Sequence, residues 1–259
     1  MITAFSDFVF KKWYWFISAM DSKGDVTFMN YGFSRNKEKI KLQDADEINR
    51  YSIQLYDFLA NRIDLKDKTL LEVGSGRGGG LSYINRYLSP RSTIGIDLCE
   101  RAVRFCNDHY KQDNIHFQVG NAMNLEFDKA TFDVVLNLES SHLYPKMGKF
   151  ISEVRRVLKD DGTFLYTDFR ESSEIEALTK LFKKEGFDII ENHNINDEVV
   201  EALQLSTSER LALIKKVMPR IFWGSSKKFA ATEGSTTYHK FESGKLEYVL
   251  FVMKKGISN

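Results

Sequence analysis

The residues best suited to chemistry begin with a cluster of glycines. Five glycines, at positions 74, 76, 78, 79 and 80, follow the mostly apolar run at residues 70–73. A helical pattern starts at Leu81, so the stretch predicts a buried strand, a tight turn and a helix start. Glycine can adopt positive φ and lets a ligand approach the backbone, and a helix start presents free N–H groups. The turn is therefore predicted to cradle a nucleotide-like ligand.

Two cofactors are compatible with this turn. Gly74, Gly76 and Gly79 match the dinucleotide pattern G-x-G-x-x-G, with Asp97 following at the expected spacing. The same stretch resembles motif I of class I S-adenosylmethionine (SAM)-dependent methyltransferases, in which the strand ends acid–apolar–Gly-x-Gly-x-Gly. Glu72 favours SAM, because dinucleotide folds usually keep that position apolar and SAM carries an ammonium and a sulfonium. A glycine-rich turn that binds nothing is the structural alternative.

Further cofactor contacts are expected at the carboxyl ends of the strands, where parallel sheets bind ligands. Asp97 can accept from both ribose hydroxyls, or it can cap the following helix. Asn121 can accept from the adenine amino group, although the methyltransferase pattern often has Asp there, and Met123 can pack on the base. The predicted cofactor-binding residues are Tyr31, Glu72, Gly74, Gly76, Asp97, Leu98, Asn121, Ala122, Met123 and Asn137.

His142 and Asp168 are the candidate catalytic residues. They follow two neighbouring predicted strands, on the side where this architecture presents the methyl group. A neutral histidine can accept a proton from an acceptor hydroxyl, and a carboxylate can orient the ring. The structural alternative is that His142 caps the helix after Pro145 and Asp168 pairs with Arg170. No spacing of His, Cys, Asp or Glu matches a metal motif, so no metal is expected.

The elements that must position these residues alternate between strand and helix patterns. Such alternation predicts an α/β fold with a Rossmann-like, seven-stranded, mostly parallel sheet and helices on both faces. Strands are expected at residues 69–73, 92–97, 115–119, 132–138, 162–168, 187–192 and 246–253. Helices are expected at residues 42–62, 80–88, 99–110, 147–159, 173–185 and 197–223.

Four regions are expected along the chain. Residues 1–62 form an N-terminal helical lid rich in aromatic residues, and residues 63–196 form the SAM-binding core. Residues 197–240 form a substrate cap inserted before the last strand, which lies in residues 241–259. The structural alternatives are an N-terminal helix packed on the core and an insert with no ligand contact.

Composition narrows the function classes. The net charge is +1, and 42% of the residues are hydrophobic, so neither a nucleic-acid surface nor stable membrane insertion is expected. Cys99 and Cys106 lie too far apart along one predicted helix to form a disulfide. A reduced, cytoplasmic location is the expectation.

A more specific resemblance comes from the run Leu136-Asn137-x-Glu139-x-Ser141-His142-x-Tyr144-Pro145. With the glycine turn and Asp168-x-Arg170, it resembles the phthiotriol/phenolphthiotriol dimycocerosate methyltransferases, which methylate a hydroxyl of a lipid-like polyketide. His142 and Asp168 also match the catalytic pair of similar sugar O-methyltransferases.

The resemblance implies SAM-dependent O-methylation of an apolar small molecule, with S-adenosylhomocysteine as product. N- or C-methylation by proximity alone, an NAD(P)-dependent oxidoreductase and a non-catalytic SAM-binding module remain alternatives. The acceptor is not identified, and a homodimer is left open.

Overall fold

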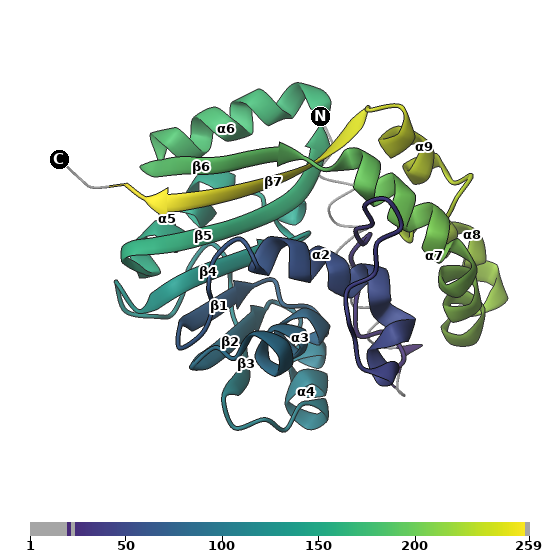
Figure 1. The fold of residues 1–259 in the computed structure, drawn as a ribbon, viewed down its shortest axis with the longest axis horizontal. Coiled ribbons are helices and arrows are strands. Elements are labelled where there is room, and N and C mark those ends of the chain that lie inside the picture. Colours follow the sequence, from purple (N-terminus) through teal and green to yellow (C-terminus); the bar gives the residue numbers. More distant parts are fainter. Residues whose placement is uncertain (1–19, 22–23, 257–259) are drawn as a thin grey trace.

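The computed structural model describes residues 20–21 and 24–256. Within them, seven strands form one sheet in the order β3-β2-β1-β4-β5-β7-β6, and only β7 runs antiparallel to its neighbours. The strands are β1 (Thr69–Val73), β2 (Ser92–Asp97), β3 (Ile115–Val119), β4 (Phe132–Leu138), β5 (Leu158–Glu171), β6 (Phe187–Asn194) and β7 (Leu246–Lys255). This arrangement confirms the predicted fold class (Figure 1).

Helices cover both faces of the sheet. Side chains of successive strand residues point to opposite faces, so Val134 and Leu136 of β4 join one apolar cluster and Val135 joins another. The first cluster includes residues of α2 (Arg50–Ala60), α3 (Gly79–Leu88) and α4 (Glu100–His109). The second includes residues of α5 (Met147–Val157) and α6 (Ile175–Lys184).

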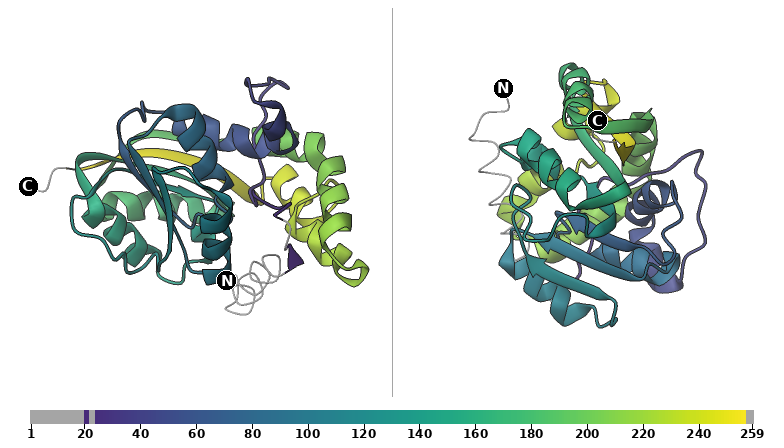
Figure 2. Two further views of the ribbon diagram at one scale, coloured as in Figure 1. Left: turned by 90° about the horizontal axis from the view of Figure 1, so that it is seen from below. Right: turned by 90° about the vertical axis from the view of Figure 1, so that its left-hand side faces the viewer.

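Three helices and a short 3₁₀ turn lie between β6 and β7, where the insert is expected. They are α7 (Asn196–Val217), η4 (Arg220–Phe222), α8 (Trp223–Phe229) and α9 (Thr236–Glu242). Figures 1 and 2 show this cap at one end of the molecule, opposite the end of β7 at Lys255. α9 falls in a stretch for which no helix is predicted, and it extends past the expected cap boundary at residue 240.

A segment near the start of the chain runs between the core and the cap. In this N-terminal segment, defined as residues 24–34, Tyr31 N donates to Glu139 Oε2 over 2.8 Å and Ser34 N donates to Glu198 O over 3.0 Å. The expected helix at 42–62 begins as the 3₁₀ helix η1 (Asp44–Asn49) and continues as α2. The aromatic residues between positions 5 and 16, assigned to the lid, lie outside the described residues.

Two boundaries differ clearly from the prediction. The helix expected at 197–223 ends at Val217 shortly before Pro219, and α8 extends past residue 223 into a stretch with no predicted helix. The helix expected at 147–159 ends at Val157, and β5 begins at Leu158 rather than at residue 162. Leu158 pairs with Phe132 of β4, and the other end of β5 pairs with β7 as far as Glu171. Hydrogen bonding to two neighbours makes β5 longer than its apolar run.

Candidate active site

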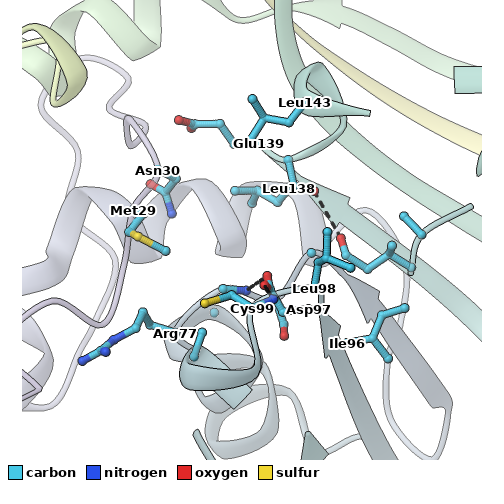
Figure 3. A pocket seen from close by; sticks show the side chains of 18 of the residues that line it. Met29, Asn30, Arg77, Ile96, Asp97, Leu98, Cys99, Leu138, Glu139 and Leu143 are labelled. Carbon is cyan, nitrogen blue, oxygen red and sulfur yellow. Dashed lines mark hydrogen bonds between the residues drawn. The ribbon is translucent and has the colours of Figure 1, made fainter. Parts of the chain in front are cut away.

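A cavity of about 330 Å³ lies at the carboxyl ends of the central strands (Figure 3). Seven predicted cofactor residues line it, namely Gly74, Gly76, Asp97, Leu98, Asn121, Ala122 and Met123. The prediction missed several other wall residues, including Thr27, Phe28, Met29, Asn30, Tyr56, Ser75, Cys99, Glu139, Ser140, Leu143 and Tyr144. The wall therefore combines the glycine turn, the loops after three strands, and the N-terminal segment.

The glycines of the turn serve two different purposes. Gly76 has φ of +53°, a conformation that side chains disfavour, and it lies on the cavity wall. A Cβ on Gly80 would collide with the Tyr56 ring, so this glycine allows α3 to pack closely against α2. Only part of the glycine cluster is therefore explained by a ligand.

Gly76→Val is expected to lower SAM affinity by at least about tenfold, because the side chain would project into the cavity. Isothermal titration calorimetry on the folded variant measures this change. Gly234→Val is the matched control, since Gly234 also has positive φ, +77°, but an added Cβ there meets nothing within 4 Å. Equal SAM affinity in the two variants would remove Gly76 from the binding site.

Asp97 hydrogen-bonds both to the glycine turn and to the loop that follows β2. Its Oδ2 accepts from Gly76 N over 2.9 Å, and its Oδ1 accepts from Cys99 N over 2.8 Å. Burial raises the pKa of this carboxyl, and the backbone N–H groups act against that rise. The predicted ribose contact is compatible with this geometry, because each oxygen keeps a second lone pair after the loop contacts. The helix-capping alternative is not observed, since α4 has Cys99 as its N-cap and no side-chain cap hydrogen bond.

Three predicted cofactor residues lie behind the wall rather than on it. Glu72 is fully buried and accepts from Tyr56 OH over 2.8 Å, and burial raises its pKa to about 8. Asn137 Nδ2 donates to Val73 O and to Ser140 Oγ, each over 2.8 Å. Tyr31 contacts Glu139 through its backbone. Cofactor contact by Glu72, Asn137 and Tyr31 stays a prediction.

Glu139 is the wall residue with the most unusual environment. It is 7% exposed, and its φ is +48°, a strained value for a residue other than glycine. Its Oε2 accepts from Tyr31 N over 2.8 Å and from Tyr248 OH over 2.7 Å. Burial raises the pKa of Glu139 to about 8. The sequence signal was present, since Glu139 directly follows β4, but it was not assigned to the cofactor site.

His142 and Asp168 come together as expected. His142 Nδ1 lies 2.9 Å from Asp168 Oδ1, and His142 N donates to Asp168 Oδ2 over 2.9 Å. The ring packs against Phe169, with centroids 4.4 Å apart. Among the described residues, His142 Nε2 has no hydrogen-bond partner. Neither His142 nor Asp168 lines the cavity itself, although Leu143 next to His142 does.

The environment of Asp168 favours its charged form. Burial alone would raise its pKa, but the nearby charges of His142 and Arg170 and the hydrogen bonds from His142 and Ser141 outweigh burial. The pKa of Asp168 is therefore held well below its ordinary value. The structural alternative is observed for Asp168 but not for His142. Arg170 Nη1 lies 3.2 Å from Asp168 Oδ2, whereas no side chain makes a capping hydrogen bond at the start of α5.

Comparison with known proteins decides the family. A model described as a methyltransferase domain matches residues 71–166. A fatty-acid O-methyltransferase of Mycolicibacterium smegmatis is 35% identical over 232 residues, which cover 89% of this chain and 84% of the relative. The phthiotriol/phenolphthiotriol dimycocerosates methyltransferase of Mycobacterium tuberculosis is 32% identical over 248 residues, covering 95% and 92%. The chain belongs to the class I SAM-dependent methyltransferases.

Solved structures agree with this methyltransferase in fold. The [4+2]-cyclase SpnF aligns with a TM-score of 0.73 at 18% identity, covering 95% of each chain. Geranyl diphosphate C-methyltransferase from Streptomyces coelicolor A3(2), in complex with S-adenosylhomocysteine, aligns with a TM-score of 0.67 at 17% identity. That alignment covers 93% of this chain and 98% of the neighbour. The predicted cofactor, SAM, is confirmed, and the dinucleotide interpretation is set aside.

The cavity of the methyltransferase is suited to this cofactor. Its volume falls within the ordinary range for small-molecule sites. Ser75 Oγ is a buried hydroxyl of a wall residue with no partner in the described part of the chain. Asp97 and Glu139 add carboxyl groups suited to hydroxyl and cationic groups of SAM. Within residues 20–21 and 24–256, no cluster of three His, Cys, Asp or Glu side chains is arranged to hold a metal.

Proposed function

We propose that this methyltransferase methylates a hydroxyl oxygen of an apolar, lipid-like small molecule, with His142 as the general base and Asp168 as its orienting partner. The observation that carries the proposal is the 2.9 Å contact between His142 Nδ1 and Asp168 Oδ1. That contact fixes the tautomer in which Nδ1 carries the proton, so Nε2 is free to accept one.

The chemistry needs a base because an alcohol is a poor nucleophile while it holds its proton. SAM, when bound, supplies the electrophilic methyl group. His142 Nε2 takes the proton from the acceptor hydroxyl as the oxygen–carbon bond forms. Asp168, fully buried and charged, holds the ring and stabilises the imidazolium. The strand ends supply the alignment and exclude water.

The apolar acceptor is supported by the aromatic surroundings of the pair. Phe169 packs against His142 and also against Tyr31 and Phe241, with ring centroids 4.4, 5.5 and 5.6 Å apart. Phe241 belongs to α9 in the cap, so the cap contributes to this aromatic layer. The names of the two bacterial relatives also refer to lipid-like acceptors, a fatty acid and a phthiotriol.

A matched acceptor series tests the proposal. We expect methyl-labelled SAM to label a long-chain alcohol as its ether, with little label in the fatty acid or the fatty amine of equal chain length. Mass spectrometry of the extracted products distinguishes ether, ester and N-methyl products. Preferential labelling of the acid would show carboxylate methylation, in which the nucleophile is already ionised and His142 is not needed as a base. Preferential labelling of the amine would show N-methylation.

We also expect a cytoplasmic location, no nucleic-acid partner, and a division of the chain at residues 62, 196 and 240, with a homodimer left open. No helix in the described portion combines the length and apolarity needed to cross a bilayer.

A further inference from the structure

The charges of the long cap helix are divided between its two ends. Its first half carries Glu198, which pairs with Arg35 over 2.9 Å, and Glu201, which accepts from Ser34 Oγ over 3.1 Å. From residue 210 to residue 232 the sequence contains six basic residues and no acidic one. The net charge of the whole chain is only +1, because acidic residues elsewhere offset the positive charge of this segment.

The basic residues gather around the turn between α7 and α8. We call residues 215–228 the cap tip. Lys215 and Lys216 occupy the last turn of α7, Arg220 begins η4, and Lys227 and Lys228 occupy the last turn of α8. A helix as short as α8 spans only about 10 Å, so its lysines lie close to the turn. Figures 1 and 2 show α7 and α8 at the end of the molecule opposite the end of β7 at Lys255.

Most of these cations have no acidic partner. Lys216 pairs with Asp25 over 2.8 Å. Across the described parts of the chain, Lys215, Arg220, Lys227 and Lys228 make no ion pair. A lysine in the last turn of a helix interacts favourably with the helix dipole, and this accounts for the two lysines at the end of α7 and the two at the end of α8. It does not explain Arg220, which lies at the turn itself.

A large apolar side chain stands among the cations. Ile221 is 85% exposed, the highest value among the exposed large apolar residues of the described chain. Its neighbour Trp223 is partly exposed, and its Nε1 donates to Met218 O over 2.9 Å. An exposed apolar side chain at a turn flanked by basic helix ends matches a bilayer surface, where the apolar group enters the headgroup boundary and lysines reach anionic phosphates.

The cap tip is also connected to the cavity wall. Ile214 near the end of α7 and Met218, which follows that helix, pack with Val26, and Met29 packs against this group. Met29 lines the cavity, and Figure 3 shows it beside Asn30 on the side of the pocket toward which the Glu139 carboxyl points. A bilayer held at the cap tip would therefore contact the part of the cap that packs against a cavity-wall residue.

We propose that the cap tip docks this methyltransferase on the surface of an anionic lipid bilayer, with Ile221 inserted among the headgroups and Lys215, Arg220, Lys227 and Lys228 contacting lipid phosphates. This docking is peripheral and requires no spanning helix. It is measured without turnover, so its failure would leave the proposed O-methylation untouched.

Vesicle sedimentation tests the proposal. The full chain is mixed with vesicles of phosphatidylcholine alone or of phosphatidylcholine with phosphatidylglycerol. We expect binding only to the anionic vesicles, weakened by high salt. The triple variant R220Q/K227Q/K228Q should lower the partition coefficient about a hundredfold, at about fivefold per cation. Ile221→Asp should lower it roughly tenfold or more.

Matched controls separate docking from general charge and hydrophobicity. K180Q/K183Q/K184Q removes three cations near the end of α6, and Ile48→Asp changes an isoleucine that is 77% exposed on η1. Both controls should bind vesicles like the wild type, and all variants should keep SAM affinity, which verifies folding. Equal binding to neutral vesicles, or equal losses in controls and cap-tip variants, would overturn the proposal. Tighter binding to duplex DNA, insensitive to Ile221→Asp, would overturn it in favour of a nucleic-acid surface.

Discussion

Replacing His142 by alanine is expected to lower the rate of methyl transfer by about a hundredfold to ten-thousandfold while leaving SAM affinity unchanged. That loss corresponds to roughly 3–5 kcal/mol of activation free energy. The physical reason is that His142 contacts Asp168 and has its Nε2 available, whereas the cavity wall is made by other residues. Single-turnover kinetics with the natural acceptor at neutral pH measure the chemical step directly.

Two further variants refine this test. Asp168→Asn should lose as much or less, because the ring remains while its orientation suffers, and the double variant should be little worse than His142→Ala. His193→Ala is the matched control, since His193 Nε2 lies 2.9 Å from Glu191 Oε2 in a surface pair on β6. A near-normal rate for His142→Ala would exclude the pair, and Glu139 or proximity alone would have to account for catalysis.

Arg77→Met is expected to lower the free energy of unfolding by about 3–5 kcal/mol, because it leaves a buried carboxylate without its partner. Arg77 Nη2 lies 2.8 Å from Asp21 Oδ2, and each side chain is 1% exposed. Arg77 Nε also donates to Val26 O over 3.0 Å, and its guanidinium carbon lies 3.6 Å from the centroid of Phe105. Figure 3 shows this side chain directed away from Asp97 and Glu139, so its main contacts are structural.

Urea denaturation of the wild type and the variants measures this change. Arg104→Met is the matched control, because Arg104 pairs with Glu100 on the surface, where such a pair contributes less than about 1 kcal/mol. Adding Asp21→Asn to Arg77→Met should recover part of the loss, since no buried charge then remains. Equal midpoints for Arg77→Met and Arg104→Met would show that the buried pair of Arg77 and Asp21 contributes no more to stability than the surface pair.

The core strands were predictable because their signal is local. β1 to β4 are short and bounded by turn residues, and their predicted and observed limits coincide. β1 and β4 are mostly buried, whereas the edge strand β3 is buried only at Ile115 and Phe117. β5 was truncated in the prediction because Lys159, Asp160 and Asp161 look like a loop, although pairing with β4 begins at Leu158. α9 was missed because its first residues favour helix weakly, whereas Ser235 caps it and Tyr238 and Phe241 are buried.

The residues of the site were likewise predictable only where a local sequence pattern marks them. The glycine turn and the loops after β2 and β3 were predictable, since strand ends in a parallel sheet meet at one edge. The wall formed by Thr27 to Asn30 was not, because no local pattern reveals that a segment some fifty residues earlier crosses the turn. The assignment of Glu72 to the cofactor rests on its motif position; its buried side chain accepts from Tyr56 OH, which lies on the wall, and direct contact with the cofactor stays a prediction.

The contacts of Tyr31 bear on the order in which the molecule is completed during synthesis. Its backbone N–H donates to Glu139, 108 positions later, and its carbonyl accepts from Arg210, 179 positions later. Its hydroxyl donates to Phe229 O, 198 positions later. The N-terminal segment leaves the ribosome early, yet Glu139 follows only near the middle of the chain, and Arg210 and Phe229 are made late. Closing such long loops is slow. The cofactor cavity is therefore a late product of folding, and a nascent chain that ends before the cap contains the glycine turn without its full wall.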